Sequence, residues 1–145
     1  MDLVLRETTL DDLPILFEHQ RDPVANEVAV FAARDWDAFV AHDAKIRSDP
    51  TLIRRTVVVD DKVVGSIGCF GDDQREVWYW YDRAVWGRGI GTATLAAFLD
   101  EVTERPLIAH VAVTNVGSAK VLERCGFVEV GRETTDVEEI VYRLA

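Results

Sequence analysis

The feature that most constrains the fold of this chain is a strand, a glycine-rich turn, a helix and a second strand that follow one another between residues 76 and 113. Aromatic residues fill the first predicted strand, Glu76–Asp82. An apolar helix is expected from Ile90 to about Thr103. The nearly continuous apolar run Leu107–Val113 predicts a central strand that is covered on both faces. Two strands joined through one helix run parallel as a right-handed crossover, so the chain is expected to form an α/β fold.

Shorter patterns on both sides of this unit complete the predicted order of elements. A helix that ends near Gln20 and a second one capped by Asp35 precede a three-stranded meander. The stretch from Val24 to Ala33 has no clear period and is not assigned to any element. The order is β-α-α-β-β-β-α-β-α-β-β around a mixed central sheet. The remaining predicted elements are the strands Leu3–Arg6, Ile53–Val59, Val63–Phe70, Phe127–Val130 and Glu139–Leu144 and the helices from Trp36 to about Arg47 and from Val116 to Arg124.

The length and the charge of the chain limit its class. At 145 residues the chain is expected to form one domain, residues 1–145, which buries roughly 70% of its unfolded surface. Its 16 basic and 26 acidic residues give a net charge of −10, which argues against binding of nucleic acid. The same charge is compatible with a cationic substrate such as an amine, and it is also typical of an ordinary soluble protein.

The sequence carries no recognisable targeting or metal signal. No apolar run approaches a length of about 20 residues and the N-terminus does not resemble a signal peptide, so no membrane partner and a cytoplasmic location are expected. Cys69 and Cys125 lie in apolar surroundings without a Cys-x-x-Cys spacing, and both are expected to be buried free thiols. No spacing typical of metal ligands occurs, so no metal is expected.

The glycine-rich turn Trp86–Thr92 predicts an anion-binding site. The first turn of a helix has backbone N–H groups without partners, and the helix dipole adds partial positive charge there. Phosphate is the usual ligand of such a site. Gly87, Gly89 and Gly91 would let the backbone approach a ligand without a Cβ between them, and the guanidinium of Arg88 suits phosphate. The turn is therefore interpreted as a pyrophosphate cradle.

Two of three candidate ligands for this cradle fit poorly. A nucleoside-triphosphate loop ends in Gly-Lys-Ser/Thr, and Gly91-Thr92 lacks the lysine. A dinucleotide-binding loop has a further glycine three residues after the second one, where this chain has Thr92, and it follows the first strand rather than the fourth. The third candidate is coenzyme A.

Two segments of the chain carry a resemblance to a known family. Gly89-Ile90-Gly91 follows a strand and opens a helix, and Asn115-x-x-Ser118 begins a helix that ends in Gly126-Phe127. This pair resembles the GNAT superfamily of acetyl-CoA-dependent N-acetyltransferases, whose motifs are Gln/Arg-x-x-Gly-x-Gly/Ala and Asn-x-x-Ser/Ala. The first position of the first motif is Trp86 here, and the turn that begins with it resembles that of the Rim-type ribosomal-protein N-terminal acetyltransferases. The resemblance covers most of the chain.

The resemblance implies the acyl-CoA N-acyltransferase (GNAT) fold and acetyl-CoA as cosubstrate. Amides of the turn would hold the pyrophosphate, and backbone groups of the preceding strand would pair with the pantetheine arm. Asn115 and Ser118 would lie beside the thioester, with Lys120 and Arg124 as outer contacts, although Asn115 could equally serve only as a helix cap. The amides are those of Arg88, Gly89, Ile90, Gly91, Thr92 and Ala93, and the strand residues are Trp80, Tyr81 and Asp82.

Glu76 and His110 are the candidates for the base that deprotonates an acceptor amine. His110 interrupts an otherwise apolar strand, so its ring must find a partner or line a wet cleft, and either residue could equally be structural. Many members of the family place a tyrosine four residues before the glycine of Gly-Phe, as a general acid. That position is Leu122 here, which cannot donate a proton, and Ser118 is a weak substitute.

The predicted function is acetyl transfer from acetyl-CoA to a primary amine, by direct attack on the thioester. The acceptor is a protein N-terminus or a small molecule, and the protein is expected to be a monomer or a homodimer. The alternative, kept open by Leu122, is a non-enzymatic acyl-CoA-binding sensor or interaction module. Asn26-Glu27 and the second helix are expected to set acceptor specificity. The aromatic residues that line an acceptor pocket or join the core are Phe31, Trp36, Trp78, Trp80 and Trp86.

Overall fold

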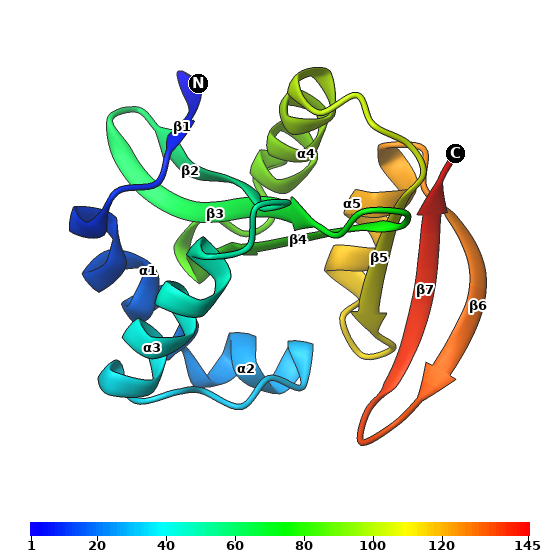
Figure 1. Ribbon diagram of the computed structural model, residues 1–145, viewed down its shortest axis with the longest axis horizontal. Helices are drawn as coiled ribbons and strands as arrows, with labels where there is room; N and C mark the ends of the chain where they lie inside the picture. The colour runs from blue at the N-terminus through cyan, green and yellow to red at the C-terminus, as the bar shows by residue number, and fades with distance from the viewer.

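The computed structural model describes residues 1–145 and contains a seven-stranded mixed sheet with helices on both faces (Figure 1). The strand order is β1-β2-β3-β4-β5-β7-β6, and only β4 and β5 are parallel neighbours. The strands are β1 (Leu3–Glu7), β2 (Ile53–Val59), β3 (Lys62–Phe70), β4 (Arg75–Tyr81), β5 (Leu107–Ala112), β6 (Val128–Thr134) and β7 (Glu138–Leu144). The helices are α1 (Leu13–Gln20), α2 (Pro23–Ala29), α3 (Trp36–Arg47), α4 (Ile90–Glu101) and α5 (Val116–Arg124), with short 3-10 turns at Leu10–Asp12 and Arg83–Val85. The predicted α/β class and mixed sheet are confirmed.

The one helix that the sequence pattern did not predict is α2. Its seven residues make only two turns, which is too short for a 3.6-residue period to show. The side chain of Asp22 accepts a hydrogen bond from the backbone N–H of Val24, and Pro23 occupies the first helical position. The Asp-Pro pair therefore both ends α1 and begins α2. The helix ends at Val30, which has a left-handed φ of 51°.

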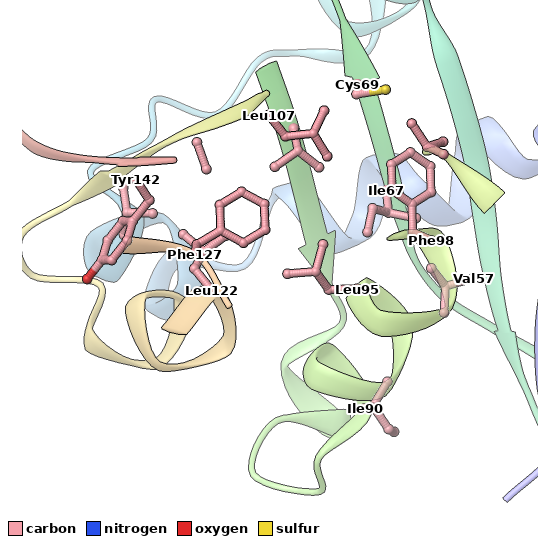
Figure 2. Close-up of a cluster of buried hydrophobic side chains, with 14 of the residues drawn as sticks. Val57, Ile67, Cys69, Ile90, Leu95, Phe98, Leu107, Leu122, Phe127 and Tyr142 are labelled. Atoms are coloured by element: carbon pink, nitrogen blue, oxygen red, sulfur yellow. The ribbon is translucent and has the colours of Figure 1, made fainter. Parts of the chain in front are cut away.

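The main core lies between the sheet and the helices α4 and α5, and Figure 2 shows its central side chains. Leu95 and Phe98 of α4 are fully buried against Ile67 of β3. Leu122 of α5 is also fully buried and lies beside Phe127 (Figure 2). Burying one such side chain stabilises the fold by about 1.5–3 kcal/mol. These contacts hold α4 and α5 in the same core against the sheet.

A smaller apolar cluster covers the other face of the sheet. Leu13 and Leu16 of α1 pack with Phe39 of α3. Phe17 packs against this cluster, and the exposed Trp36 contacts Phe17 with ring centroids 5.2 Å apart. The helices α1 to α3 therefore lie on the face opposite to α4 and α5 (Figure 1). No helix is both long enough and apolar enough to cross a membrane.

Strands β4 and β5 lie side by side only at their first residues. They pair at Arg75 with Leu107 and at Glu76 with Ile108, and then diverge (Figure 1). Beyond this point β4 stays paired with β3 up to Tyr81, and β5 stays paired with β7 up to Ala112. One edge of β4 is therefore unpaired over its second half. Such an edge offers backbone donors and acceptors to any extended group that enters the gap.

Both cysteines are free thiols. Cys69 is fully buried on β3, whereas Cys125 is only half-buried at the end of α5. Burial raises the pKa of the Cys69 thiol, and a hydrogen bond from Arg75 opposes this rise only in part. Burial also raises the pKa of the Cys125 thiol, so neither cysteine has the lowered pKa that is typical of a reactive thiol.

Candidate active site

The glycine-rich turn connects the open edge of β4 to α4. Gly87 and Gly89 have φ values of 75° and 77°, which side chains rarely adopt. A Cβ at either position would meet no protein atom within 4 Å, so within the protein itself the turn needs glycine there only for its backbone conformation. At Gly91 the reason is the reverse, because a Cβ would lie 3.2 Å from Cγ2 of Val121 on α5. Within the protein, Gly91 therefore clears space for α5, and the prediction that the three glycines let a ligand approach the backbone stays a prediction.

The first amides of α4 have no partner within the helix. The first backbone bond of the helix runs from Ala93 N–H to the carbonyl of Gly89 at 3.1 Å. The N–H groups of Ile90, Gly91 and Thr92 come before it, and the N-cap residue Gly89 has no side chain that could accept from them. The helix dipole adds partial positive charge at the same place. This is the physical arrangement of an anion site.

A cleft of about 530 Å³ extends from this turn along β4 and α5. Helix α2 borders it on the other side, where the hydroxyl of Thr114 donates to the carbonyl of Val28 at 2.8 Å. Of the predicted site residues, those that line the cleft are Trp80, Tyr81, Gly89, Ile90, Gly91, Thr92, Asn115 and Ser118, together with Lys120 and Arg124. Those that do not line it are Glu76, Asp82, Arg88, Ala93 and His110.

The backbone of β4 turns only alternate residues toward the cleft. Asp82 donates its N–H to the carbonyl of Val64 on β3 at 2.8 Å. Because backbone groups alternate sides along an antiparallel pair, Trp80 and Asp82 face β3, while Tyr79 and Tyr81 face the gap. Of the three strand residues predicted to pair with the pantetheine arm, only Tyr81 has backbone groups that face the gap. The backbone groups of Tyr79 face the gap as well.

Two cationic side chains and a buried hydroxyl without a partner lie at the end of the cleft near the glycine-rich turn. Lys120 and Arg124 are one turn apart on α5, and neither has a carboxylate within 4 Å although the chain is acidic. The side-chain oxygen of Thr92 is buried without any hydrogen-bond partner. A buried hydroxyl without a partner is costly unless a ligand or water satisfies it. This end of the cleft is thus suited to a polar, negatively charged group.

Tyr79 is a site residue that the sequence analysis missed. Its hydroxyl lies 2.8 Å from Oγ of Ser118 and 3.1 Å from the carbonyl oxygen of the same residue. Burial raises the pKa of Tyr79, and the bond to Ser118 offsets this only partly. The ring of Tyr79 stacks on that of Tyr81 with a centroid distance of 5.5 Å. The only available signal was its alternation with Tyr81 on the face of β4 that α5 covers.

Asn115 fulfils the capping role that the sequence left open. Its Oδ1 accepts a hydrogen bond from the backbone N–H of Ser118 at 3.2 Å. The side chain also lines the cleft, and its amide nitrogen makes no hydrogen bond within the protein. The cap therefore uses only the oxygen and leaves two N–H donors for a ligand.

Glu76 and His110 are in direct contact on the opposite face of the sheet. Nδ1 of His110 lies 2.8 Å from Oε1 of Glu76, and Nε2 lies 3.3 Å from a carboxylate oxygen of Glu133 on β6. Side chains alternate along a strand, so Glu76 points away from Tyr79 and Tyr81, to the face of α1 to α3. The pair lies where β4 and β5 separate, at the inner end of the gap. The two candidate bases thus form one hydrogen-bonded unit.

The aromatic residues divide between core and cleft. The indole N–H of Trp80 donates to the carbonyl of His19 at 2.9 Å, and its ring contacts Phe31 with centroids 4.9 Å apart. Trp86 lines the mouth of the cleft and is 42% exposed. Trp36 is 41% exposed and contacts Phe17 and Phe39 at the edge of the small core instead. No group of histidine, cysteine, aspartate or glutamate side chains is arranged to hold a metal ion.

Comparison with known proteins identifies the family. Residues 2–128 match the model of the acetyltransferase (GNAT) domain. No curated protein sequence matches the chain.

Solved structures share the fold at low sequence identity, as three of them illustrate. An acetyltransferase from Thermus thermophilus has a TM-score of 0.86 and 18% identity, covering 99% of this chain and 97% of that one. Spermidine N-acetyltransferase from Vibrio cholerae, in complex with CoA and spermine, has a TM-score of 0.83 and 17% identity, covering 98% and 94%. Aminoglycoside acetyltransferase AAC(6')-Ib, in complex with coenzyme A and kanamycin, has a TM-score of 0.82 and 17% identity, covering 99% and 95%. With a family model that matches most of its length, the chain belongs to the GNAT acetyltransferases.

Proposed function

We propose that this protein is an N-acetyltransferase that moves the acetyl group of acetyl-CoA to a primary amine. The observation that carries the proposal is the open edge of β4, which has unpaired amides of α4 at one end and the Glu76–His110 pair at the other. Two of the similar structures hold CoA together with spermine or kanamycin, which are both amines. The acidic net charge of −10 also favours a cationic acceptor.

The cleft fits coenzyme A through groups that lack partners in the protein. The amides of Ile90, Gly91 and Thr92 would hold the pyrophosphate, and the buried hydroxyl of Thr92 would find an acceptor there. Lys120 and Arg124 would contribute positive charge from α5. The edge of β4 would pair with the amide groups of the pantetheine arm as an added strand does.

Acetyl-CoA supplies the activated thioester, and the protein supplies a base and an oxyanion donor. His110, held at Nδ1 by Glu76, would take the proton of the attacking amine at Nε2. Glu133 contacts the same nitrogen at 3.3 Å, but its side chain is 60% exposed and can move aside. The N–H of Tyr79 on the open edge would donate to the oxyanion that forms on attack. Amine and leaving group would then lie on opposite faces of the sheet.

The branch of the family and the acceptor are part of the same proposal. The turn that begins with Trp86 supports the Rim-type branch, whose acceptors are protein N-termini, and the exposed Trp86 ring at the cleft mouth could contact such a chain. A small polyamine or aminosugar is the other class of acceptor. The non-enzymatic alternative, an acyl-CoA-binding module, is favoured only by the core position of Leu122, which leaves α5 without a phenol in the cleft.

Calorimetry with acetyl-CoA, followed by an assay of thiol release, tests the proposal. Acetyl-CoA is expected to bind the wild-type protein, and CoA release should exceed hydrolysis with spermine, kanamycin or a short peptide. Gly89→Glu should abolish binding by adding charge and bulk at the turn, whereas Gly131→Glu on β6, which does not line the cleft, should not. Binding without release to any of these amines would favour the non-enzymatic module. Absence of binding would refute both functions.

A further inference from the structure

The hydroxyls of Tyr79 and Ser118 meet in the wall of the cleft, and no other hydroxyl of α5 is available there. Ser118 is the only residue of α5 with a side-chain hydroxyl. Leu122, one turn further along, is fully buried beside Phe127 (Figure 2). Both Tyr79 and Ser118 line the cleft, 2.8 Å apart. Any hydrogen bond from a hydroxyl of α5 to the leaving sulfur must therefore come from Ser118, whose hydroxyl contacts that of Tyr79.

Counting hydrogens shows that the pair has two arrangements. In one, the phenol of Tyr79 donates to the carbonyl of Ser118 at 3.1 Å, and the Ser118 hydroxyl donates to the phenol oxygen. In the other, the phenol donates to Oγ of Ser118, and the Ser118 hydrogen is free to point into the cleft. The two arrangements differ only in the rotation of two O–H bonds. A negative charge that develops in the cleft beside Ser118 would favour the second one.

We infer that Tyr79 orients and polarises the hydroxyl of Ser118 so that it donates a hydrogen bond to the sulfur of coenzyme A as the thioester breaks. This rests on the proposed function, and it adds a positioning residue from β4. Burial raises the pKa of Tyr79, so the phenol keeps its proton throughout and acts as a donor, not as an acid. The pair therefore stabilises the leaving group without giving it a proton.

The proposed step balances without a general acid. The amine nitrogen forms the new bond to the acetyl carbon, and the carbon–sulfur bond breaks with its electron pair going to sulfur. The proton of the amine goes to His110. The thiolate is held by Ser118 and takes a proton from solvent after it leaves. A thiolate is a good leaving group, so a hydrogen bond in place of a proton is sufficient.

Binding of coenzyme A and of desulfo-coenzyme A at two pH values tests this inference without turnover. The two values are pH 6.5 and pH 9.5, which lie on either side of an ordinary thiol pKa of about 8.5. The ratio of the wild-type affinity for coenzyme A to that for desulfo-coenzyme A should be about tenfold or more higher at pH 9.5 than at pH 6.5. Tyr79→Phe and Ser118→Ala should lose most of this rise, and Ser118→Thr should keep it. Tyr142→Phe is the matched control, because it also removes a phenol that bonds α5, at Glu123, but outside the cleft.

Turnover separates this inference from the proposed function. Tyr79→Phe should lower kcat about tenfold or more, with KM for acetyl-CoA changed less than about twofold, because the donor acts on the leaving group and not on binding. A wild-type rise in preference that Tyr79→Phe retains would overturn the inference while leaving acetyl transfer intact. A loss of equal size in Tyr142→Phe would also overturn it, since it would reflect displacement of α5. Absence of any binding of coenzyme A would overturn the inference and the proposed function together.

Discussion

At the residue scale, Asp12 is the most constrained side chain outside the cleft. Its carboxylate accepts hydrogen bonds from both terminal nitrogens of Arg6, at 2.8 and 2.7 Å. It also accepts from the backbone N–H of Thr9 at 2.8 Å and from the hydroxyl of Thr56 at 3.0 Å. These bonds, led by those from Arg6, lower the pKa of Asp12 to about 2. They tie β1 and β2 to the start of α1. The position of α1 depends on them, and α1 holds Trp80 through the carbonyl of His19.

Asp12→Asn is expected to lower the free energy of unfolding by about 2 kcal/mol at pH 7, the order that the depressed pKa implies. The side chain of Arg6 is 41% exposed, so screening by solvent places the effect at or below this value. The stabilisation is complete above the unfolded pKa of about 4 and is lost as the pH falls through about 2. Urea unfolding between pH 7 and pH 2 should therefore show the two proteins converging in acid. Asp11→Asn, an exposed neighbour with the same change in charge, should stay within about 0.5 kcal/mol of the wild type.

The Glu76–His110 pair carries the second prediction at this scale. Glu76→Gln is expected to reduce kcat by about a hundredfold, because the amide cannot hold His110 as the carboxylate does, and general-base catalysis contributes about 10²–10⁴-fold. Acetyl-CoA affinity should be unchanged, since Glu76 does not line the cleft. Glu133→Gln is the control. The contact between Glu133 and Nε2 of His110 must break before Nε2 can accept a proton, so weakening this contact should not lower kcat. A comparable loss in both variants would show that the cluster is structural.

At the element scale, the ends of the helices decide what the cleft can do. The N-cap of helix α4 is Gly89, which has no side chain that could accept from the first amides, so these amides stay free. Helix α5 begins at Asn115, whose oxygen is used as a cap. Helix α2 ends at Val30, a β-branched residue at φ 51° next to the wall of the cleft. The first two ends suit a ligand, and the third stores backbone strain.

Gly89→Ala is expected to weaken binding of acetyl-CoA about fivefold to tenfold. The added Cβ meets no atom, but alanine disfavours a φ of 77° by about 1 kcal/mol, so the turn should shift away from its binding geometry. Calorimetric titration measures the effect. Gly131→Ala, at a glycine on β6 without positive φ, provides the comparison. Equal affinity in the Gly89 variant would mean that the turn does not hold the ligand.

Val30→Gly is expected to raise the free energy of unfolding by about 1 kcal/mol. The left-handed conformation costs valine about 1–2 kcal/mol, and glycine avoids this but loses part of the gain to unfolded-state entropy. Val24→Gly within the same helix should instead destabilise by about 0.3–0.5 kcal/mol, because glycine is a poorer helix former than valine. Denaturant unfolding compares the two variants. Destabilisation by Val30→Gly would show that the strain at this position is not relieved.

At the scale of the whole molecule, the separation of β4 from β5 creates the site. It opens a gap in the sheet with the Tyr79–Ser118 pair on one face and the Glu76–His110 pair on the other. The two strands keep their other partners, β3 and β7, so the gap is held open by regular pairing on both sides. The buried core between the sheet and the helices α4 and α5 lies beneath this gap (Figure 2).

The parts of this arrangement that depend on local sequence could be predicted, and the parts that depend on register could not. The aromatic strand, the glycine turn and the two motif helices each have a pattern within a few residues, and the structure confirms these elements. Contact between Glu76 and His110 needs the pairing of β4 with β5, across 34 positions of sequence. The bond between Tyr79 and Ser118 likewise needs the packing of α5 on β4. Helix α2 was missed because two turns are too short to show a period.

Residue-resolved hydrogen exchange of the β4 amides, with and without acetyl-CoA, tests the central claim most directly. In the free protein, the N–H groups of Tyr79 and Tyr81 face the gap and should exchange faster than that of Trp80, which is paired with β3. Acetyl-CoA should slow exchange at Tyr79 or Tyr81 by about tenfold or more, while Trp80 stays as it was, because only the open edge gains a partner. Bound acetyl-CoA with unchanged exchange at both tyrosines would contradict the placement of the acetyl donor in the gap between β4 and β5.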